Sequence, residues 1–215
     1  MADARQPQAV VAAQRGKFIT LEGVDGAGKS THVTWIAELL RKAGREVVVS
    51  REPGGTPLAE KLRSRVLSEA MDPVAETRLM FEARADHVQK VIAPALARGA
   101  WVVCDRFTDS TIAYQGAGKG VDRALIDELA RKVHPGLKPD LTLVFDASYT
   151  VSSQRLNASG RALDRFESAG SPFFERVRAA YQEIARQDPG RVRLVDGTRP
   201  AEQVKELIQK ILATL

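Results

Sequence analysis

The sequence predicts one α/β domain built on a five-stranded, mostly parallel sheet with helices on both faces. Short apolar segments alternate with helical patterns along the chain, which is typical of that class. The length of 215 residues suits a single domain. A glycine-rich phosphate-binding pattern also directly follows the first strand pattern. Ligands of such sheets bind beyond the carboxyl ends of the strands, where we therefore expect the functional residues.

Five segments have the composition of strands. The first alternates and is rich in strand-forming residues, and the others are short apolar runs of the kind buried in parallel sheets. The expected strands are residues 17–22, 46–50, 100–104, 140–146 and 191–196. The second strand cannot continue into REPGGT, because Pro53 and two glycines interrupt it.

Helical periodicity separates these strands. In the first helical segment the apolar residues Trp35, Ile36, Leu39 and Leu40 fall on one face, and Gly44 follows as a stop signal. We expect helices at about residues 31–43, 57–68, 74–97, 122–133, 171–187 and 200–214, and one from about 150 to a polar loop at 157–165. Pro94 is expected to kink or split the third of these.

Composition limits the classes of partner. The net charge of +5 comes from 32 basic and 27 acidic residues without a long basic run, so we expect no nucleic-acid partner. The single cysteine, Cys104, ends an apolar run and is expected to be buried in a protein of the reducing cytoplasm. No stretch has the length of a membrane span, so no membrane association is expected. Residues 1–15 resemble a disordered tail more than a secretory signal, and the folded domain is expected to span 16–215.

Residues 23–30, GVDGAGKS, match the P-loop pattern G-x-x-x-x-G-K-[ST]. The setting is the one that the motif requires, with a strand before it and a helix after it. Glycines let several backbone N–H groups converge on a phosphate, and the helix adds its positive end. Lys29 is placed for the β and γ phosphates, and the Ser30 hydroxyl is a candidate Mg²⁺ ligand. The expected nucleotide-binding residues are Gly23, Val24, Asp25, Gly26, Ala27, Gly28, Lys29, Ser30 and Thr31.

Arginines follow two other strands and populate the polar loop. Arg51 comes directly after the second strand and Arg106 after the third. The loop contains Arg161 and Arg165, and Arg155 lies just before it. Each could be an ordinary surface charge. Together they suit phosphoryl transfer, which needs positive charge on two bound phosphate groups and on the group in flight. We therefore expect a second substrate that bears a phosphate.

The segments VDGAGKST, REPGGT, DRF, AYQG and LDRFE together resemble the bacterial thymidylate kinases, over about residues 17–215. The P-loop alone is not specific, but REPGGT combined with DRF and AYQG is. The resemblance implies transfer of the terminal phosphoryl group of ATP to dTMP, with Mg²⁺, as a step in dTTP synthesis. It also implies a homodimer.

The resemblance assigns phosphate and metal roles to single residues. Arg51 and Arg106 correspond to the arginines that hold the acceptor phosphate. Asp25 corresponds to the acid that contacts the sugar 3′-hydroxyl. Asp105 corresponds to the carboxylate that holds Mg²⁺ through water, beside Ser30.

The resemblance also assigns the base-binding residues. Thr111, Gln115 and Arg84 correspond to positions that read the thymine edge, and Tyr114 to the ring that excludes a 2′-hydroxyl. Family members usually carry a stacking Phe four residues before the arginine, where this chain has Met80. Phe81 follows, and one residue turns a helix by about 100°, so either side chain could face the base.

The catalytic arginine is expected in a mobile lid at about residues 155–167. The family divides by where this arginine lies, and here the P-loop positions are Asp25-Gly26, without an arginine. The lid departs from the family pattern too, because Asn157 and Ser159 stand where related bacterial lids often carry their later arginines. Arg161 is therefore expected nearest the transferred group, with Arg165 second.

Three rival functions differ in what they require. A regulatory GTPase should carry an N-K-x-D signature, which the sequence lacks. A P-loop ATPase or scaffold would not need the additional arginines. A nucleoside kinase would need a carboxylate base, whereas a nucleotide phosphate, with a second pKa of about 6, is already largely dianionic at neutral pH.

Overall fold

The computed structural model describes residues 15–215. The disordered tail expected for residues 1–15 therefore lies, except for Arg15, outside the described residues. Within them the chain forms one five-stranded sheet in the order β2-β3-β1-β4-β5, and every neighbouring pair is parallel. The strands are β1 (Phe18–Gly23), β2 (Val47–Arg51), β3 (Trp101–Asp105), β4 (Leu141–Asp146) and β5 (Val192–Asp196). The predicted fold class is confirmed, and each strand lies within one residue of its expected bounds.

Helices fill the connections between the strands, and a last helix follows β5. They are α1 (Lys29–Lys42), α2 (Pro57–Ser68), α3 (Pro73–His87), η1 (Val88–Ile92), α4 (Ala93–Ala97), α5 (Thr108–Thr111), η2 (Ile112–Gly118), α6 (Arg123–Val133), α7 (Tyr149–Ala158), α8 (Ser171–Gln187) and α9 (Ala201–Leu212), where η marks a π-helical turn. The loop expected at 157–165 begins later, because α7 includes Asn157 and ends at Ala158.

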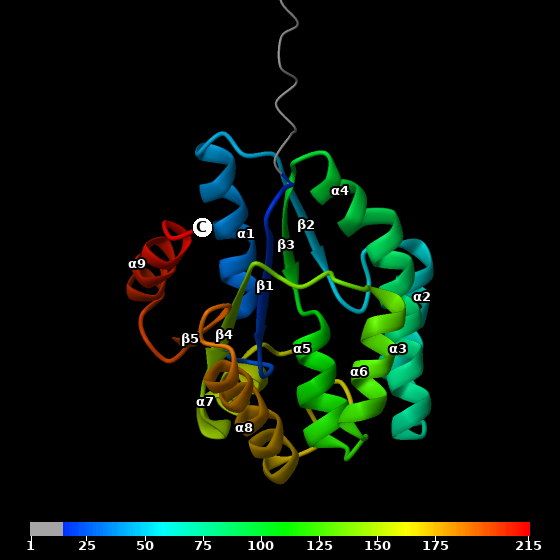
Figure 1. The fold of residues 1–215 in the computed structure, drawn as a ribbon. Coiled ribbons are helices and arrows are strands. Elements are labelled where there is room, and N and C mark those ends of the chain that lie inside the picture. The colour runs from blue at the N-terminus through cyan, green and yellow to red at the C-terminus, as the bar shows by residue number, and fades with distance from the viewer. Residues whose placement is uncertain (1–14) are drawn as a thin grey trace, which may run out of the picture.

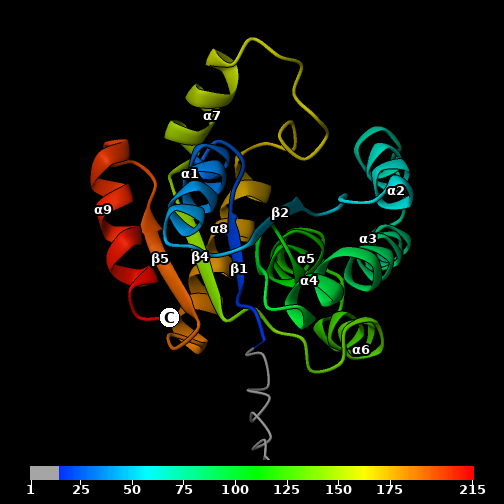
Figure 2. The same cartoon turned by 90° about the horizontal axis from the view of Figure 1, so that it is seen from above.

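The direction of each crossover decides which face a helix covers. The β1–α1–β2 connection crosses the sheet in one direction, whereas the later connections cross in the other. Because parallel crossovers are almost always right-handed, α1 lies on one face, and α3, α5 and α8 lie on the other. The helix α9 lies beside α1, where Lys205 stands 5.9 Å from the centre of the Trp35 ring (Figures 1 and 2).

Local sequence sets where the helices begin. The Thr56 hydroxyl accepts a hydrogen bond from the N–H of Ala59 at 3.1 Å, and Pro57 occupies the first helical position, where no N–H is needed. Asp72 and Pro73 start α3 in the same way. These pairs explain why the starts of α2 and α3 were predictable.

Two π-helical turns interrupt the helices. The first, η1, separates α3 from α4 just before Pro94, which has no N–H to donate to the preceding turn, so the expected split is confirmed. The second, η2, follows α5 in a segment where no helix was expected. Gly116 and Gly118 make this segment a weak helix by propensity, and packing against α8 supplies the stabilisation instead.

The interior consists mainly of Val, Leu, Ile and Ala from the sheet and from α1, α8 and α9. Cys104 is fully buried, as expected, and burial raises the pKa of its thiol well above the usual value. Among residues 15–215, no helix combines the length and apolar character of a membrane span.

The parallel register brings three sequence motifs to one edge of the sheet. Arg51, at the end of β2, pairs with Asp105 of β3, and Asp105 pairs with Leu21 of β1. The P-loop, REPGGT and DRF segments therefore begin side by side at the carboxyl ends of the strands. The segment 159–170, between α7 and α8, extends from α7 toward α2 (Figure 2).

The close approach of η2 and α8 can be tested at Gly118. A methyl group added there would lie 2.5 Å from Cε2 of Phe173 and 3.1 Å from Cγ2 of Val177. We expect Gly118→Ala to lower the free energy of unfolding by about 1–3 kcal/mol through overpacking, measured by urea denaturation. Gly190→Ala is the control, because its nearest neighbour, Oδ1 of Asp188, is 3.9 Å away. Equal losses in both variants would contradict the explanation.

Candidate active site

The P-loop wraps around the side chain of Lys29. Gly28 caps α1 in the left-handed conformation, which lets the loop turn sharply into the helix. The Lys29 Nζ group donates to the carbonyls of Gly23 at 3.0 Å and Val24 at 2.9 Å. Burial, together with Arg106, lowers the pKa of Lys29 to about 8. A bound anion would favour the charged form, so the lysine is suited to a phosphate.

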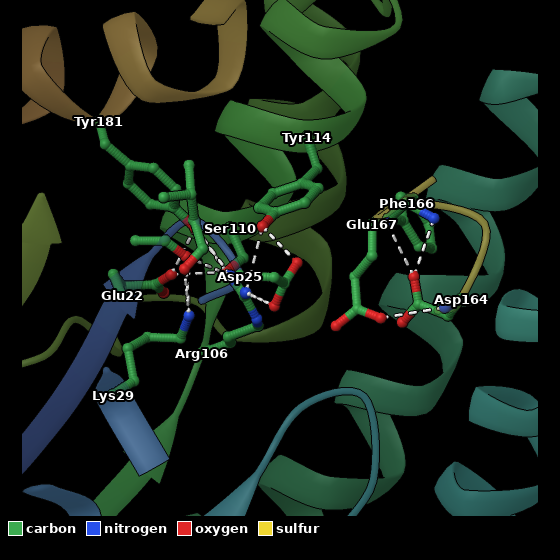
Figure 3. Close-up of polar contacts among 12 residues, drawn as sticks. Glu22, Asp25, Lys29, Arg106, Ser110, Tyr114, Asp164, Phe166, Glu167 and Tyr181 are labelled. Atoms are coloured by element: carbon green, nitrogen blue, oxygen red, sulfur yellow. Dashed lines mark hydrogen bonds and ion pairs between the residues drawn. The ribbon is translucent and has the colours of Figure 1, made fainter. Parts of the chain in front are cut away.

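An ion pair joins the P-loop to the loop after β3. Nη2 of Arg106 donates to Asp25 at 2.6 Å, and the Tyr114 hydroxyl donates to the other Asp25 oxygen at 2.8 Å (Figure 3). Burial opposes ionisation of Asp25, but Arg106 and Lys29 hold its pKa well below the usual range. Asp25 therefore stays a carboxylate at neutral pH, with both oxygens engaged.

The backbone of Arg106 is held in an unfavourable conformation. Its φ is 72°, the only positive φ of a residue other than glycine within 15–215. The Arg106 N–H donates to the carbonyl of Leu21 at 2.9 Å, and its own carbonyl accepts from the Cys104 thiol at 3.2 Å. Such strain persists only where the surroundings fix it, and it is common at functional sites.

A buried carboxylate, Glu22, supports Arg106 through the hydroxyl groups of Ser110 and Tyr181. It accepts from the N–H of Phe107 at 2.7 Å, from the Ser110 hydroxyl at 2.5 Å and from the Tyr181 hydroxyl at 2.8 Å (Figure 3). Those two hydroxyls also accept from Nη1 of Arg106. Burial, reinforced by nearby Asp109, raises the pKa of Glu22 from 4.5 to about 7.

Two cavities meet at the Asp25–Arg106 pair. The larger, the P-loop cavity, has a volume of about 740 Å³. It is lined by Asp25, Gly26, Gly28, Lys29, Ser30, Thr31, Arg51, Asp105, Arg106, Arg155 and Arg161, among others. The smaller, the inner cavity, has about 80 Å³ and is lined by Asp25, Glu52, Pro53, Arg63, Met80, Arg106, Ser110, Tyr114, Gln115, Asp164 and Phe166, among others. The shared lining residues show that a ligand could extend from one cavity into the other.

The remaining P-loop residues play structural parts. Gly23 accepts from Lys29 and Arg106 through its carbonyl, Val24 lines a small neighbouring aromatic cavity, and Ala27 is fully buried. A Cβ at Gly23 would lie 2.2 Å from the carbonyl oxygen of Phe145, so no larger residue fits there.

The two predicted metal ligands fit a magnesium ion. Ser30 and Asp105 line the P-loop cavity together with Lys29. Oδ1 of Asp105 is buried and has no hydrogen-bond partner in the described part of the chain. The described residues contain no group of three or more His, Cys, Asp or Glu that could hold a metal alone. A serine hydroxyl and one carboxylate suit Mg²⁺, which usually takes few protein ligands and completes its shell with water and phosphate.

The segment 159–170 covers the P-loop cavity with charged residues. Arg161, about half exposed, pairs with Glu167, and the two side chains line this cavity. Arg155 at the end of α7 crosses the P-loop, where Nη1 donates to the carbonyls of Gly197 at 2.8 Å and Gly26 at 3.3 Å. Arg155 and Arg161 thus both line the P-loop cavity.

The placement of Arg165 corrects a prediction. Its side chain does not line the P-loop cavity but turns to α2 and α3, where it donates to the carbonyl of Val66 and pairs with Glu76. Its guanidinium also lies 4.6 Å from the centre of the Phe166 ring. The buried negative charge of Glu76 attracts Arg165 away from the P-loop, so it is a structural anchor in this conformation.

Phe81, one of the two side chains that could face the base, lies away from the inner cavity. Phe81 packs with Val121 and Ile126 behind the site, and its ring lies 4.6 Å from the Arg84 guanidinium. Met80 lines the inner cavity instead. Phe166, from the segment 159–170, brings an aromatic ring to the same cavity.

Arg84 and Thr111 lie buried behind the inner cavity. Nε of Arg84 donates to Glu52 at 2.6 Å and Nη2 donates to the Thr111 hydroxyl at 3.1 Å. Nη1 of Arg84 is buried and unpaired within residues 15–215, as is Oε1 of Gln115. Arg51 stands at the mouth of the P-loop cavity, where it pairs with Glu60 at 2.9 Å.

Several site residues were missed from the sequence. Glu22 and Glu52 stand at or just beyond strand ends, which could have marked them, and Asp164 and Glu167 lie within LDRFE. No sequence signal identified Tyr181, because only the packing of α8 brings it to Glu22.

Comparisons with known proteins agree on one family. The family profile described as thymidylate kinase matches residues 21–208. The chain is 57% identical over 191 residues to the thymidylate kinase of Bordetella pertussis, covering 89% of this chain and 91% of that protein. It is 53% identical over 201 residues to that of Nitrosomonas europaea, covering 93% of each. A crystal structure of thymidylate kinase from Ehrlichia chaffeensis is similar with a TM-score of 0.76 and 34% identity, over 93% of this chain and 99% of that one.

The raised pKa of Glu22 predicts a pH-dependent stability difference between the wild type and Glu22→Gln. Between pH 4.5 and about 7 the folded wild type retains a proton that the unfolded chain has lost. Wild-type stability should therefore fall relative to Glu22→Gln as pH rises through this range, and the difference should level off above it. Urea denaturation of both proteins from pH 4 to 8 measures it. A difference independent of pH would show that Glu22 does not titrate in this way.

Proposed function

The chain belongs to the thymidylate kinase family, and on that premise we propose that it transfers the terminal phosphoryl group of ATP to dTMP. The product is dTDP, an intermediate on the way to dTTP. The observation that carries the proposal is the meeting of two cavities at the Asp25–Arg106 pair. In-line transfer needs two phosphate groups held end to end, and the junction provides a cation and a carboxylate at that position.

The P-loop cavity is proposed to hold the phosphates of ATP. Lys29 and the backbone N–H groups of residues 26–31 bind them, and Arg155 adds a cation from the opposite side. Ser30 and Asp105 would hold Mg²⁺, and when bound the ion would neutralise negative charge on the phosphates. The unpartnered Oδ1 of Asp105 supports this assignment.

The acceptor phosphate is proposed to lie between Arg106 and Arg51, both of which line the P-loop cavity. The phosphate of a nucleotide is already largely dianionic at neutral pH, so no general base is required. The protein must instead offset repulsion between two anions. Asp25 is proposed to orient the acceptor by accepting from its sugar hydroxyl.

The inner cavity is proposed to bind the thymine ring beside Met80 and Phe166, with Tyr114 against the sugar. Two buried polar groups among the described residues support recognition of the hydrogen-bonding edge of thymine. Nη1 of Arg84 is an unpaired donor and Oε1 of Gln115 an unpaired acceptor. Thymine offers the complementary pair, the O4 acceptor and the N3–H donor. Buried polar groups left unpaired are costly, so a ligand that pairs both is favoured.

The segment 159–170 is proposed to act as the lid. Arg161 is half-exposed and lines the P-loop cavity, so a small closing movement would bring it to the phosphoryl group in flight. Closure would also exclude water, which otherwise competes as the phosphoryl acceptor.

A homodimer and a cytoplasmic location are proposed on family resemblance. Analytical ultracentrifugation of the purified protein would measure the oligomeric state.

A coupled ATP assay against a panel of monophosphates tests the proposed function. We expect dTMP to be the preferred acceptor, with no activity toward thymidine and loss of activity when EDTA removes Mg²⁺. Failure to use any monophosphate would refute the proposal.

The lid assignment predicts different effects for two matched arginine variants. Arg161→Ala should lower kcat about 100-fold or more, because it removes a cation proposed to act on the transition state. Arg165→Ala should lower kcat much less, because Arg165 pairs with Glu76 outside the P-loop cavity. Steady-state kinetics of both variants with dTMP measure the difference. An equal loss of kcat in the two variants would show that Arg165 reaches the phosphoryl group.

A further inference from the structure

A buried carboxylate that the proposed mechanism does not use lies next to the inner cavity. Glu76 on α3 is fully buried. Its Oε1 accepts from Nε2 of Gln115 at 2.8 Å and from Nζ of Lys119 at 2.7 Å. Its Oε2 accepts from Lys119 at 2.6 Å and from Arg165. One carboxylate thus joins α3, η2 and the lid.

The partners of Glu76 determine which hydrogen bonds its carboxylate can make. A carboxylate removed from water is stable as an anion only when cations and donors surround it, and here Lys119 and Arg165 both bind it. An ionised carboxylate can only accept hydrogen bonds. Every group that faces Glu76 must therefore present a donor.

This requirement determines the orientation of the Gln115 amide. The two ends of a glutamine amide have the same shape, so the hydrogen-bond network decides which way it points. Glu76 can pair only with the NH₂ end of Gln115, at 2.8 Å. The carbonyl oxygen must then point away from Glu76.

The freed carbonyl is available to a ligand. Gln115 lines the inner cavity, and its Oε1 is buried without a partner among residues 15–215. A buried acceptor of this kind favours a ligand that donates to it and disfavours one that presents another acceptor.

We propose that Glu76 is a positioning residue that sets base selectivity, by holding Gln115 with its carbonyl toward the base. The inference rests on the proposed function, because it takes the inner cavity as the base site. Thymine and uracil carry an N–H at ring position 3 and satisfy the carbonyl. Cytosine carries an unprotonated nitrogen there, so two acceptors would face each other.

Replacement of Glu76 by glutamine removes the requirement that Gln115 present its NH₂ group to residue 76. In Glu76→Gln the carbonyl oxygen is required by Lys119 and Arg165, which leaves the new NH₂ group to face Gln115. Gln115 can then turn its own carbonyl toward residue 76 and its NH₂ group toward the cavity. That arrangement suits the ring nitrogen of cytosine. Arg84 remains a donor, which disfavours the cytosine amino group, so we expect relaxed selectivity and not a reversal.

The test compares kcat/KM for dTMP, dUMP and dCMP in the wild type and in Glu76→Gln. The dCMP-to-dTMP ratio should rise about tenfold in the variant, because one acceptor–acceptor conflict is removed. The dUMP-to-dTMP ratio should stay unchanged, because both bases carry the N–H. A purely structural role would lower all three values together and leave both ratios at their wild-type values, which would overturn the proposal.

Two further variants make the test decisive. Lys119→Met removes one partner of Glu76 but leaves an acceptor-only carboxylate, so the dCMP-to-dTMP ratio should stay as in the wild type. An equal rise in Lys119→Met would overturn the proposal. Gln115→Met removes the amide while Glu76 keeps both cations. It should also raise the ratio about tenfold, and it replaces Glu76→Gln if that variant does not fold.

The proposed function and this inference fail in different ways. If the wild type uses neither dTMP nor dUMP, the proposed function is wrong. If the wild type prefers dTMP but Gln115→Met retains the wild-type ratio, only the role of Glu76 and Gln115 is wrong.

Discussion

The ion pair between Asp25 and Arg106 is the interaction on which the arrangement of the site depends. It joins the P-loop to the loop after β3 and stands where the two cavities meet. Nη1 of Arg106 also donates to the carbonyl of Gly23, so one guanidinium binds both Gly23 and Asp25 of the P-loop. Because the Arg106 backbone is in the left-handed region, the pair exists only while neighbouring strands hold that conformation. The register of the sheet therefore determines the geometry of the Asp25–Arg106 pair.

Three buried carboxylates in this part of the molecule are each stabilised in a different way. Glu52 is matched by the Arg84 guanidinium, with His87 on its other oxygen. Glu76 is matched by two cations. Glu22 has neutral donors as its hydrogen-bond partners, and burial raises its pKa to about 7. Direct pairing with a cation thus distinguishes Glu52 and Glu76 from Glu22, whose pKa burial raises toward neutrality.

The fold and the P-loop residues that line the larger cavity were largely predictable from sequence. Strands and most helices followed from periodicity, and the P-loop residues that line the cavity from motif spacing. The failures share a cause, because long-range contacts decided them. Arg165 follows the buried charge of Glu76, and Phe81 follows an apolar cluster formed with α6. The helix η2 forms where local propensity opposes it, because α8 packs against it. None of these contacts is visible in local sequence.

The buried cysteine has a practical consequence. Cys104 is the single cysteine of the chain, it is fully shielded, and burial keeps its thiol protonated. Maleimide reagents, which attack accessible thiolates, should leave the folded wild-type protein unmodified. A thiol introduced at Ser159, an exposed position beside Arg161, would then be the sole reactive group. The native chain is thus already a suitable background for attaching a fluorophore to the proposed lid and testing whether it moves during turnover.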